Sequence, residues 1–376
     1  MINNFFSETL QRAGSRLTQP VRPARILLDK NEQATDVDES LKIKLVESLL
    51  NADWNRYPSA DHSSIEAKIA DYCNLDPQNI LLGGGSANFI TVLLNYFALQ
   101  NKKITIAQPS YSLFDYHCKT YNIQYTPWYL TKDLEFDHEN RPGLDKDSVL
   151  IITSPNNPVG NTIDLQKLTD LLEAYPDSCI ILDNVYREFC SIDYSSLISQ
   201  YKNLVVLRSF SKAFPIAGLR LGYLCASPAM VSVIRKLLLQ FSINPMSLLF
   251  AKEILFNVDF VKSSKARVRE IIHAREELRM RIEGAFSENT LTIYPSEGNF
   301  LLLRIHDNKV FQNLMEDLAE AGISILNTSS FVLLKNTFRV SIGKPGENEG
   351  FFQALKNSLE SNIFTSRMLE SLQDRQ

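Results

Sequence analysis

The chain has 376 residues, of which 44% are hydrophobic and 22% charged, a balance typical of a globular protein with room for two domains. Lys and Arg total 39 against 43 Asp and Glu, so the net charge is −4 and no broad basic field indicates nucleic acid or an anionic membrane as a partner. The five cysteines are scattered without a C-x-x-C pair, which favours a reducing cytoplasm, and neither a secretory signal nor a membrane span is expected.

The first part of the chain predicts an arm followed by two helices. Residues 1–25 are polar and mixed, which is typical of an arm and not of a domain core. Apolar residues then recur at helical spacing over residues 41–50 and again over 65–72. A turn-rich loop around Tyr57 separates the two.

Short apolar runs and helical segments alternate through the middle of the chain. The runs cover residues 104–107, 149–152, 180–182 and 204–207, and a helical pattern such as that of residues 165–174 lies between them. Runs that are apolar at every position are typical of strands covered on both faces in a parallel sheet. The alternation predicts an α/β layered domain over roughly residues 40–255.

The last third predicts a smaller α+β unit. Residues 261–285 combine many charges with apolar residues at helical spacing, which indicates a long, partly exposed helix. Strand-like segments at 298–305 and 338–343 flank a helical pattern near 310–321.

Residues that could bind a ligand or take part in a reaction follow each of the apolar runs. In chain order these are a Gly83–Ser86 turn before a helix, Tyr111, Asn157, Asp183 with Tyr186, and Lys212. Ligands of open parallel sheets bind outside the carboxyl ends of the strands, so we expect these groups to meet at one edge. Taken singly, each tyrosine also fits a hydrophobic core and the asparagine fits an ordinary turn.

Three of these features predict a phosphate site beside a reactive amine. A glycine turn at a helix N-terminus presents N–H groups to a phosphate, although a tight packing turn explains it equally well. Lys212 after a buried strand can act as a nucleophile or base if it is desolvated, whereas most lysines are solvated surface groups. Ser209, Ser211 and Arg220 would complete a phosphate cup next to it. Asp183 ends an apolar run, where a carboxylate needs a partner, and a protonated pyridine nitrogen would provide one. Alternatively, Asp183 serves as a helix cap or in a structural salt bridge.

Together and in this order, the motifs resemble those of the fold-type I pyridoxal-phosphate (PLP) aminotransferases of class I/II, from about residue 28 to residue 348. The segments SPNNPVG (154–160), LDNVYREF (182–189) and SFSKAFPIAGLRLGY (209–223) resemble the N-P-x-G loop, the D-E-A-Y-x-E-F strand end and the S-x-S-K segment of that family. Within the family, the segments LLDKNEQ (27–33), NRYP (55–58), LLGGGSANFI (81–90) and FRVSIGKPGEN (338–348) are most similar to the histidinol-phosphate aminotransferases.

The resemblance implies an aspartate-aminotransferase-like fold. It has a large domain, a mostly parallel mixed sheet between helices, and a smaller α+β domain. The expected division is an N-terminal arm over residues 1–39 that packs with the small domain, a large PLP-binding domain over 40–260 and a small domain over 261–376. A homodimer is implied, with Tyr57 reaching the cofactor phosphate of the neighbouring subunit.

The resemblance also implies a role for each site residue. Lys212 joins the cofactor covalently and moves the substrate proton, Asp183 keeps the ring nitrogen protonated, and Tyr111 stacks on the ring. The other implied cofactor-binding residues are Asn157 and Tyr186 at the ring's phenolic oxygen, and Gly85, Ser86, Ala87, Ser209, Ser211 and Arg220 at the phosphate. Arg339 would bind the anionic group of the substrate through a bidentate fork, together with Asn31 and Asn157, and no metal is expected.

The implied reaction converts histidinol phosphate and 2-oxoglutarate into imidazole acetol phosphate and glutamate, in histidine biosynthesis, or is that of a close paralogue using another amino acid. Two departures from the family pattern bear on it: Leu326 stands where a substrate-binding arginine is common, and Ala87 and Asn88 replace an acidic pair. A PLP-dependent decarboxylase of a phosphorylated amino acid, similar to threonine-phosphate decarboxylase, is the alternative. A non-catalytic sensor of PLP or an amino acid is a third reading.

Overall fold

The computed structural model describes residues 5–12 and 24–373, with side chains placed for residues 5–11 and 24–362. Of the arm expected over residues 1–25, residues 1–4 and 13–23 lie outside the described residues. The short helix α1 (Glu8–Arg12) lies near α5. No helix in the described ranges combines the length and the apolar character that a bilayer crossing requires.

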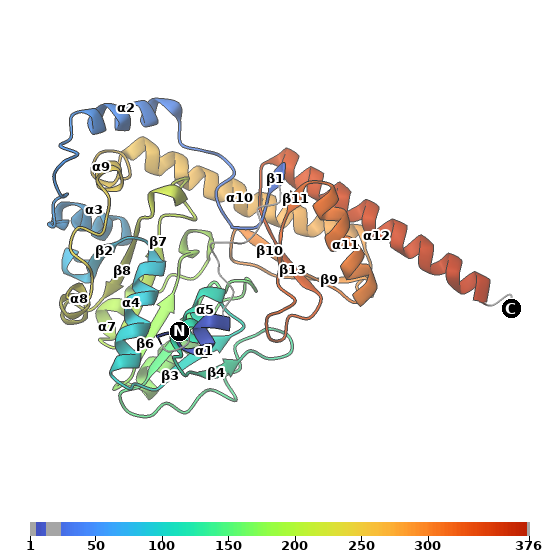
Figure 1. Cartoon of the computed structure of the whole chain (residues 1–376), viewed down its shortest axis with the longest axis horizontal. Helices are drawn as coiled ribbons and strands as arrows, with labels where there is room; N and C mark the ends of the chain where they lie inside the picture. The colour runs from blue at the N-terminus through green and yellow to red at the C-terminus, as the bar shows by residue number, and fades with distance from the viewer. Residues whose placement is uncertain (1–4, 13–23, 374–376) are drawn as a thin grey trace.

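A seven-stranded sheet forms the centre of the larger part of the molecule, in the order β2-β8-β7-β6-β5-β3-β4 (Figure 1). The strands are β2 (Ile80–Gly83), β3 (Ile104–Gln108), β4 (Thr126–Tyr129), β5 (Val149–Thr153), β6 (Cys179–Asp183), β7 (Leu204–Ser209) and β8 (Gly222–Ala226). Strand β8 runs antiparallel to both of its neighbours, and the other pairs are parallel. The mostly parallel mixed sheet is therefore confirmed, and the carboxyl ends of β2, β3, β5, β6 and β7 meet at one edge.

Helices cover both faces of this sheet. They are α3 (Ser63–Cys73), α4 (Ser86–Leu99), α5 (Ser112–Tyr121), α6 (Leu165–Ala174), α7 (Ser195–Gln200) and α8 (Pro228–Arg235), with 3-10 turns at Pro77–Asn79, Arg187–Phe189 and Ala217–Leu219. Two further helices, α2 (Glu39–Leu50) and α9 (Pro245–Glu253), pack against each other. Along β5, Leu150 and Ile152 pack in one apolar core, while Val149 and Ile151 pack in the other. Because successive side chains of a strand point to opposite faces, a strand between two cores is apolar at every position.

The smaller part has a sheet and a core of its own. Its four antiparallel strands, in the order β12-β13-β10-β9, are β9 (Leu291–Tyr294), β10 (Phe300–Ile305), β12 (Leu326–Asn327) and β13 (Thr337–Ser341), and its helices are α11 (Asn308–Glu320) and α12 (Pro345–Gln373). Strand β1 (Ile26–Leu27) pairs in parallel with β11 (Ile323–Ser324), so the N-terminal segment joins this part.

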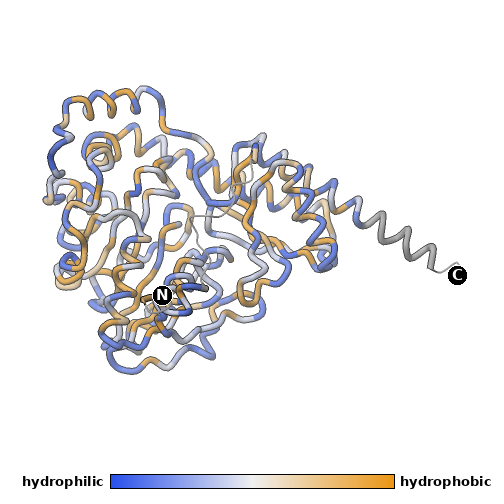
Figure 2. The backbone as a smooth tube through the Cα atoms, viewed as in Figure 1, coloured by the Kyte–Doolittle hydropathy of each residue, from blue (hydrophilic) through white to orange (hydrophobic). Residues whose placement is uncertain are grey.

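The long helix α10 (Val258–Ala285) connects the two parts and crosses the expected boundary between residues 260 and 261 (Figure 1). Hydrophilic and hydrophobic residues alternate along it in Figure 2, as in a helix that is covered on one side. The division into residues 1–39, 40–260 and 261–376 stays a proposal.

The expected elements are present, with shifted ends. The helical pattern of residues 165–174 is α6, and those of 41–50 and 65–72 lie within α2 and α3. Each expected strand of the large sheet extends one or two residues further toward its carboxyl end, to Gln108, Thr153, Asp183 and Ser209. These polar residues continue the strand ladder into the edge where the candidate site lies.

Candidate active site

A cavity of about 270 Å³ lies at the carboxyl edge of the large sheet, facing the smaller part. Its lining residues are Asp29, Lys30, Ser86, Ala87, Tyr111, Ser112, Thr153, Asn157, Asp183, Val185, Tyr186, Ser209, Ser211, Lys212, Arg220, Leu326, Phe331 and Arg339. The structure therefore brings together every predicted site residue except Gly85, Asn31 and Tyr57.

Asp183 ends β6 as a buried carboxyl group, with 2% of the residue exposed. Its Oδ1 atom has no hydrogen-bond partner within the protein. Burial raises the pKa of Asp183 to about 7, against the opposing influence of the Val185 backbone N–H and of the Lys212 charge. A buried carboxyl oxygen with no partner fits a ligand that brings a positively charged N–H group.

Lys212 follows β7 and points its amine toward the N-terminal segment. Its Nζ donates a hydrogen bond to the backbone oxygen of Lys30 at 2.9 Å, and the side chain of Gln33 donates to the backbone oxygen of Lys212 at 2.8 Å. Burial, helped by the charge of Arg339, lowers the pKa of Lys212 to about 8. A substantial fraction of the amine is thus neutral, and nucleophilic, at mildly alkaline pH.

A phosphate-sized cup lies at the start of α4. Gly85 has a φ of 89°, and no side chain caps the helix that begins at Ser86. The Asn88 N–H donates to the Gly85 backbone oxygen, and the N–H groups of Ser86 and Ala87 remain available to an anion. The Ser211 hydroxyl is buried without a partner. A Cβ atom at Gly222 would lie 2.8 Å from the Cα of Gly85. Gly222 is therefore what lets β8 approach the turn and brings Arg220 beside it.

Arg339 on β13 is 4% exposed and lies on the opposite wall. It donates hydrogen bonds to Oδ1 of Asn157 and to the backbone oxygen of Asp29, while its Nε has no partner in the protein. Asn31 lies behind the wall and donates to the Tyr186 hydroxyl at 2.9 Å. Burial raises the pKa of Tyr186 to about 12, so this hydroxyl keeps its proton and can donate a hydrogen bond.

Sequence reasoning missed several lining residues, and three expected residues do not line the cavity: Gly85 lies at the turn before α4, Asn31 lies behind the wall, and Tyr57 lies elsewhere. Tyr57 is 81% exposed and stacks on Phe241 at 4.9 Å between ring centroids, outside the cavity, so its contact with a neighbouring subunit stays a prediction. Lys30 and Phe331 line the cavity but stood out by no chemical pattern in the sequence. The sequence indicated Gly222 only as one residue of the segment SFSKAFPIAGLRLGY (209–223), without a role of its own.

Leu326 lines the cavity at the position where an arginine is common in the family. It is paired across the sheet with Arg339, so an apolar side chain stands beside the one guanidinium on this wall. The cations that line the cavity are Lys30, Lys212, Arg220 and Arg339.

The sequence and the fold of this chain are similar to those of known aminotransferases. A sequence model of aminotransferase class I and II matches residues 24–355. Histidinol-phosphate aminotransferase of Pyrococcus furiosus is 33% identical over 337 residues, which are 89% of this chain and 93% of that protein. The solved structure of histidinol-phosphate aminotransferase from Clostridium acetobutylicum has a TM-score of 0.78 at 22% identity and covers 89% of this chain and 99% of its own.

A further solved structure contains a cofactor. Histidinol-phosphate aminotransferase from Sinorhizobium meliloti, in complex with pyridoxal-5'-phosphate, has a TM-score of 0.75 at 20% identity and covers 93% of this chain and 99% of its own. At such identities the structural likeness establishes the fold, and the sequence match establishes the family. The chain therefore belongs to the aminotransferase class I and II family and has the fold of its PLP-dependent members.

Proposed function

We propose that this protein is a PLP-dependent aminotransferase that moves the amino group of histidinol phosphate to 2-oxoglutarate. The observation that carries the proposal is one cavity in which the Lys212 amine, the Asp183 carboxyl group with its unpartnered Oδ1 atom, and the Arg339 guanidinium converge. The substrate is taken from the names of the relatives that match most of the chain.

The residues present fit PLP group by group. Asp183 would hold the protonated ring nitrogen, Tyr111 would cover the ring face, and Asn157 with Tyr186 would bind the phenolic oxygen. The phosphate would lie between the first turn of α4 and the hydroxyl and guanidinium groups of Ser209, Ser211 and Arg220, next to Gly85 and Ala87. When bound, PLP supplies an electron-withdrawing ring that stabilises negative charge on the carbon that loses its proton.

Two side chains of the protein then carry the substrate chemistry. The Nζ atom of Lys212 would hold the cofactor covalently, and as a free amine it would remove the α-proton of the substrate as a general base. Its hydrogen bond to the Lys30 backbone oxygen directs it within the cavity. Arg339 would bind the anionic group of the substrate, which is the phosphate of histidinol phosphate or a carboxylate of 2-oxoglutarate, by exchanging its present contacts with Asn157 and Asp29 for a bidentate pair.

The wall of the cavity that includes Leu326 and Phe331 is relevant to how a phosphorylated substrate binds. These two residues make this wall, the distal end of the cavity, partly apolar. Since Lys212 and Arg220 are assigned to the cofactor, Lys30 and Arg339 are the lining cations that remain for the substrate phosphate. We assign Lys30 a contact with this phosphate, beside Arg339.

We infer that the enzyme works as a cytoplasmic homodimer. Trp54, Tyr57 and Leu239 are 77%, 81% and 80% exposed, and a second copy that covered them would remove large apolar surfaces from water. All five cysteines are free thiols, as expected in a reducing compartment. Sedimentation of the purified protein tests the dimer, and Tyr57→Ala should lower its PLP affinity.

A half-reaction tests the activity. Protein with bound PLP is mixed with histidinol phosphate alone, and conversion to the amino form of the cofactor is followed by absorbance; glutamate is then measured after 2-oxoglutarate is added. Lys212→Ala should abolish both signals, whereas Lys202→Ala, at an exposed lysine, should retain them. Conversion with other amino acids but not with histidinol phosphate would refute the substrate. Release of carbon dioxide without glutamate would instead support the decarboxylase reading.

A further inference from the structure

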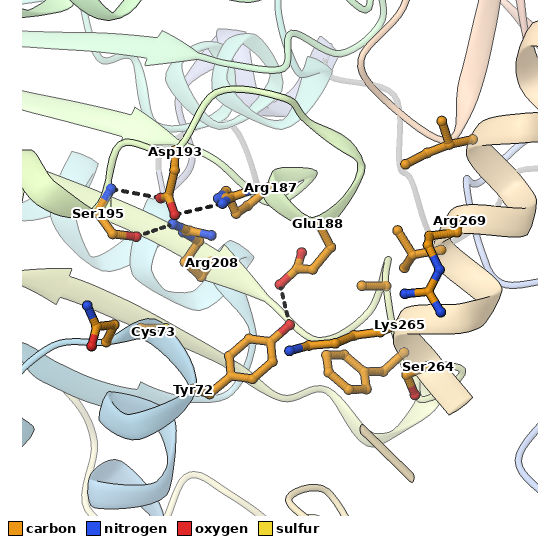
Figure 3. Close-up of a pocket in the computed structure, with 15 residues that line it drawn as sticks. Tyr72, Cys73, Arg187, Glu188, Asp193, Ser195, Arg208, Ser264, Lys265 and Arg269 are labelled. Carbon is orange, nitrogen blue, oxygen red and sulfur yellow. Dashed lines mark hydrogen bonds and ion pairs between the residues drawn. The ribbon is translucent and has the colours of Figure 1, made fainter. Parts of the chain in front are cut away.

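A second cavity, of about 380 Å³, lies apart from the active site and shares no lining residue with it. It is enclosed by α3, the segment after β6, strand β7 and helix α10 (Figure 3). Ala213 and Phe214, which directly follow Lys212, form part of its wall. The proposed aminotransferase reaction uses none of the side chains in this cavity.

The charges that line this cavity are mostly positive. Arg187, Arg208, Lys265 and Arg269 face Glu188 and Asp193. Arg187 forms an ion pair with Asp193 at 2.7 Å, and the Glu188 carboxylate accepts a hydrogen bond from the Tyr72 hydroxyl at 3.3 Å (Figure 3). In the described part of the chain, Arg208, Lys265 and Arg269 form no ion pair with a carboxylate.

Arg208 is the most constrained of the three cations. The residue is 4% exposed; its Nη2 donates to the Ser195 hydroxyl at 3.2 Å, and its Nε has no partner in the protein. A buried guanidinium is costly unless its charge and its N–H groups are matched. Glu188 faces this guanidinium without forming an ion pair with it; burial raises the pKa of the Glu188 carboxyl group, and the Arg208 charge opposes that rise.

The rest of the lining is suited to an organic group. Phe214, Val268 and Ile272 present apolar surface, and Tyr72 presents a ring over which the Lys265 ammonium lies at 5.7 Å from the centroid. A ligand that combines a compact double negative charge with a small apolar body would match both halves of the cavity.

We propose that this cavity is a second ligand site, which binds a small-molecule phosphate monoester through Arg208, Lys265 and Arg269. The site is independent of which reaction the active site catalyses. Its phosphate forms the ion pair that Arg208 lacks, and its organic part packs against Phe214 and Val268.

Calorimetric titration of the PLP-loaded protein tests the site, because bound PLP already fills the phosphate cup of the active site. The probes are phenyl phosphate, inorganic phosphate and the uncharged benzyl alcohol. We expect saturable binding of phenyl phosphate, weaker binding of inorganic phosphate and none of benzyl alcohol.

Variants separate this cavity from the active site. The double variant Lys265→Ala/Arg269→Ala removes two exposed cations and should weaken phenyl phosphate binding about tenfold or more, with unchanged transaminase activity. Lys262→Ala, at an exposed lysine on the same helix outside the cavity, should change nothing. Arg208→Lys keeps the charge but loses the planar fork, so an intermediate loss is expected. Absence of saturable binding, or binding that the double variant leaves intact, would overturn the proposal.

Discussion

Replacing Asp183 by asparagine should stabilise the cofactor-free protein and weaken its hold on PLP. The carboxyl group has a pKa near 3.8 when exposed and about 7 in the folded protein, where burial disfavours its charge. Because the folded-state pKa is raised, the penalty is absent below the unfolded pKa and grows as the pH rises through the interval between the two values.

The magnitude follows from these two pKa values. Linkage gives a cost to the folded state of about 2 kcal/mol at pH 5 and about 4 kcal/mol at pH 8.5. Asp183→Asn keeps the shape of the side chain but removes the ionisation. The variant should therefore gain between about 2 and 3 kcal/mol more stability, relative to wild type, at pH 8.5 than at pH 5. Comparing the two pH values cancels any constant cost of burying the amide.

Urea unfolding of both cofactor-free proteins at the two pH values measures this difference. Asp170→Asn removes an exposed carboxyl group and serves as the control, which should show no such pH-dependent gain. With PLP added, wild type should become more stable than Asp183→Asn, because asparagine cannot hold a protonated ring nitrogen. An equal effect of Asp183→Asn at both pH values would show that the carboxyl group does not pay a burial penalty, and would refute the reasoning.

Two further predictions concern the glycine turn at Gly85 and the amine of Lys212. Gly222→Ala places a Cβ 2.8 Å from the Cα of Gly85 and should cost about 1–3 kcal/mol of stability in urea unfolding; Gly218→Ala, where a Cβ meets nothing within 4 Å, is the control. The rate of PLP capture by the cofactor-free protein should rise about 50-fold from pH 6 to pH 8 and then level off, because only the neutral amine reacts and the pKa of Lys212 is about 8. A rate that still climbs tenfold per pH unit at pH 9 would indicate an ordinary lysine.

Much of the large sheet could be predicted because its signal is local. A strand between two cores is apolar at every position, and the run at residues 149–152 shows this without any knowledge of its neighbours. The strand ends were placed short, because Thr153 and Asp183 are polar and break the pattern while still pairing in the ladder. Polar residues that remain buried at a strand end are what a binding site requires.

The parts of the site that could not be predicted depend on contacts between distant segments. Asn31 supports Tyr186 across 155 positions of sequence, and the Lys30 backbone oxygen meets the Lys212 amine across 182. A backbone oxygen carries no residue-type signal, so no pattern could point to the second contact. The cavity around Arg208 was hidden for a similar reason, since its cations come from β7 and α10 and no motif joins them.

The assignment of Lys30 to the substrate phosphate can be separated from the rest of the mechanism. Lys30→Ala should raise KM for histidinol phosphate about tenfold, the value of a charge-assisted contact, and leave KM for histidinol, which lacks the phosphate, unchanged. Its backbone oxygen, which accepts from Lys212, survives the substitution, and Lys30→Arg should restore most of the affinity.

Leu326→Arg supplies the converse test, because this position lines the same cavity opposite Arg339 in the strand register. A guanidinium there should lower KM for histidinol phosphate and compensate the loss in Lys30→Ala. Both substitutions change a ground-state contact at the distal end, so kcat should move less than KM. If Lys30→Ala raises KM for both substrates equally, the lysine acts on the cavity as a whole and not on the phosphate. If it raises neither, Lys30 does not contact the phosphate, which would then depend on Arg339 alone.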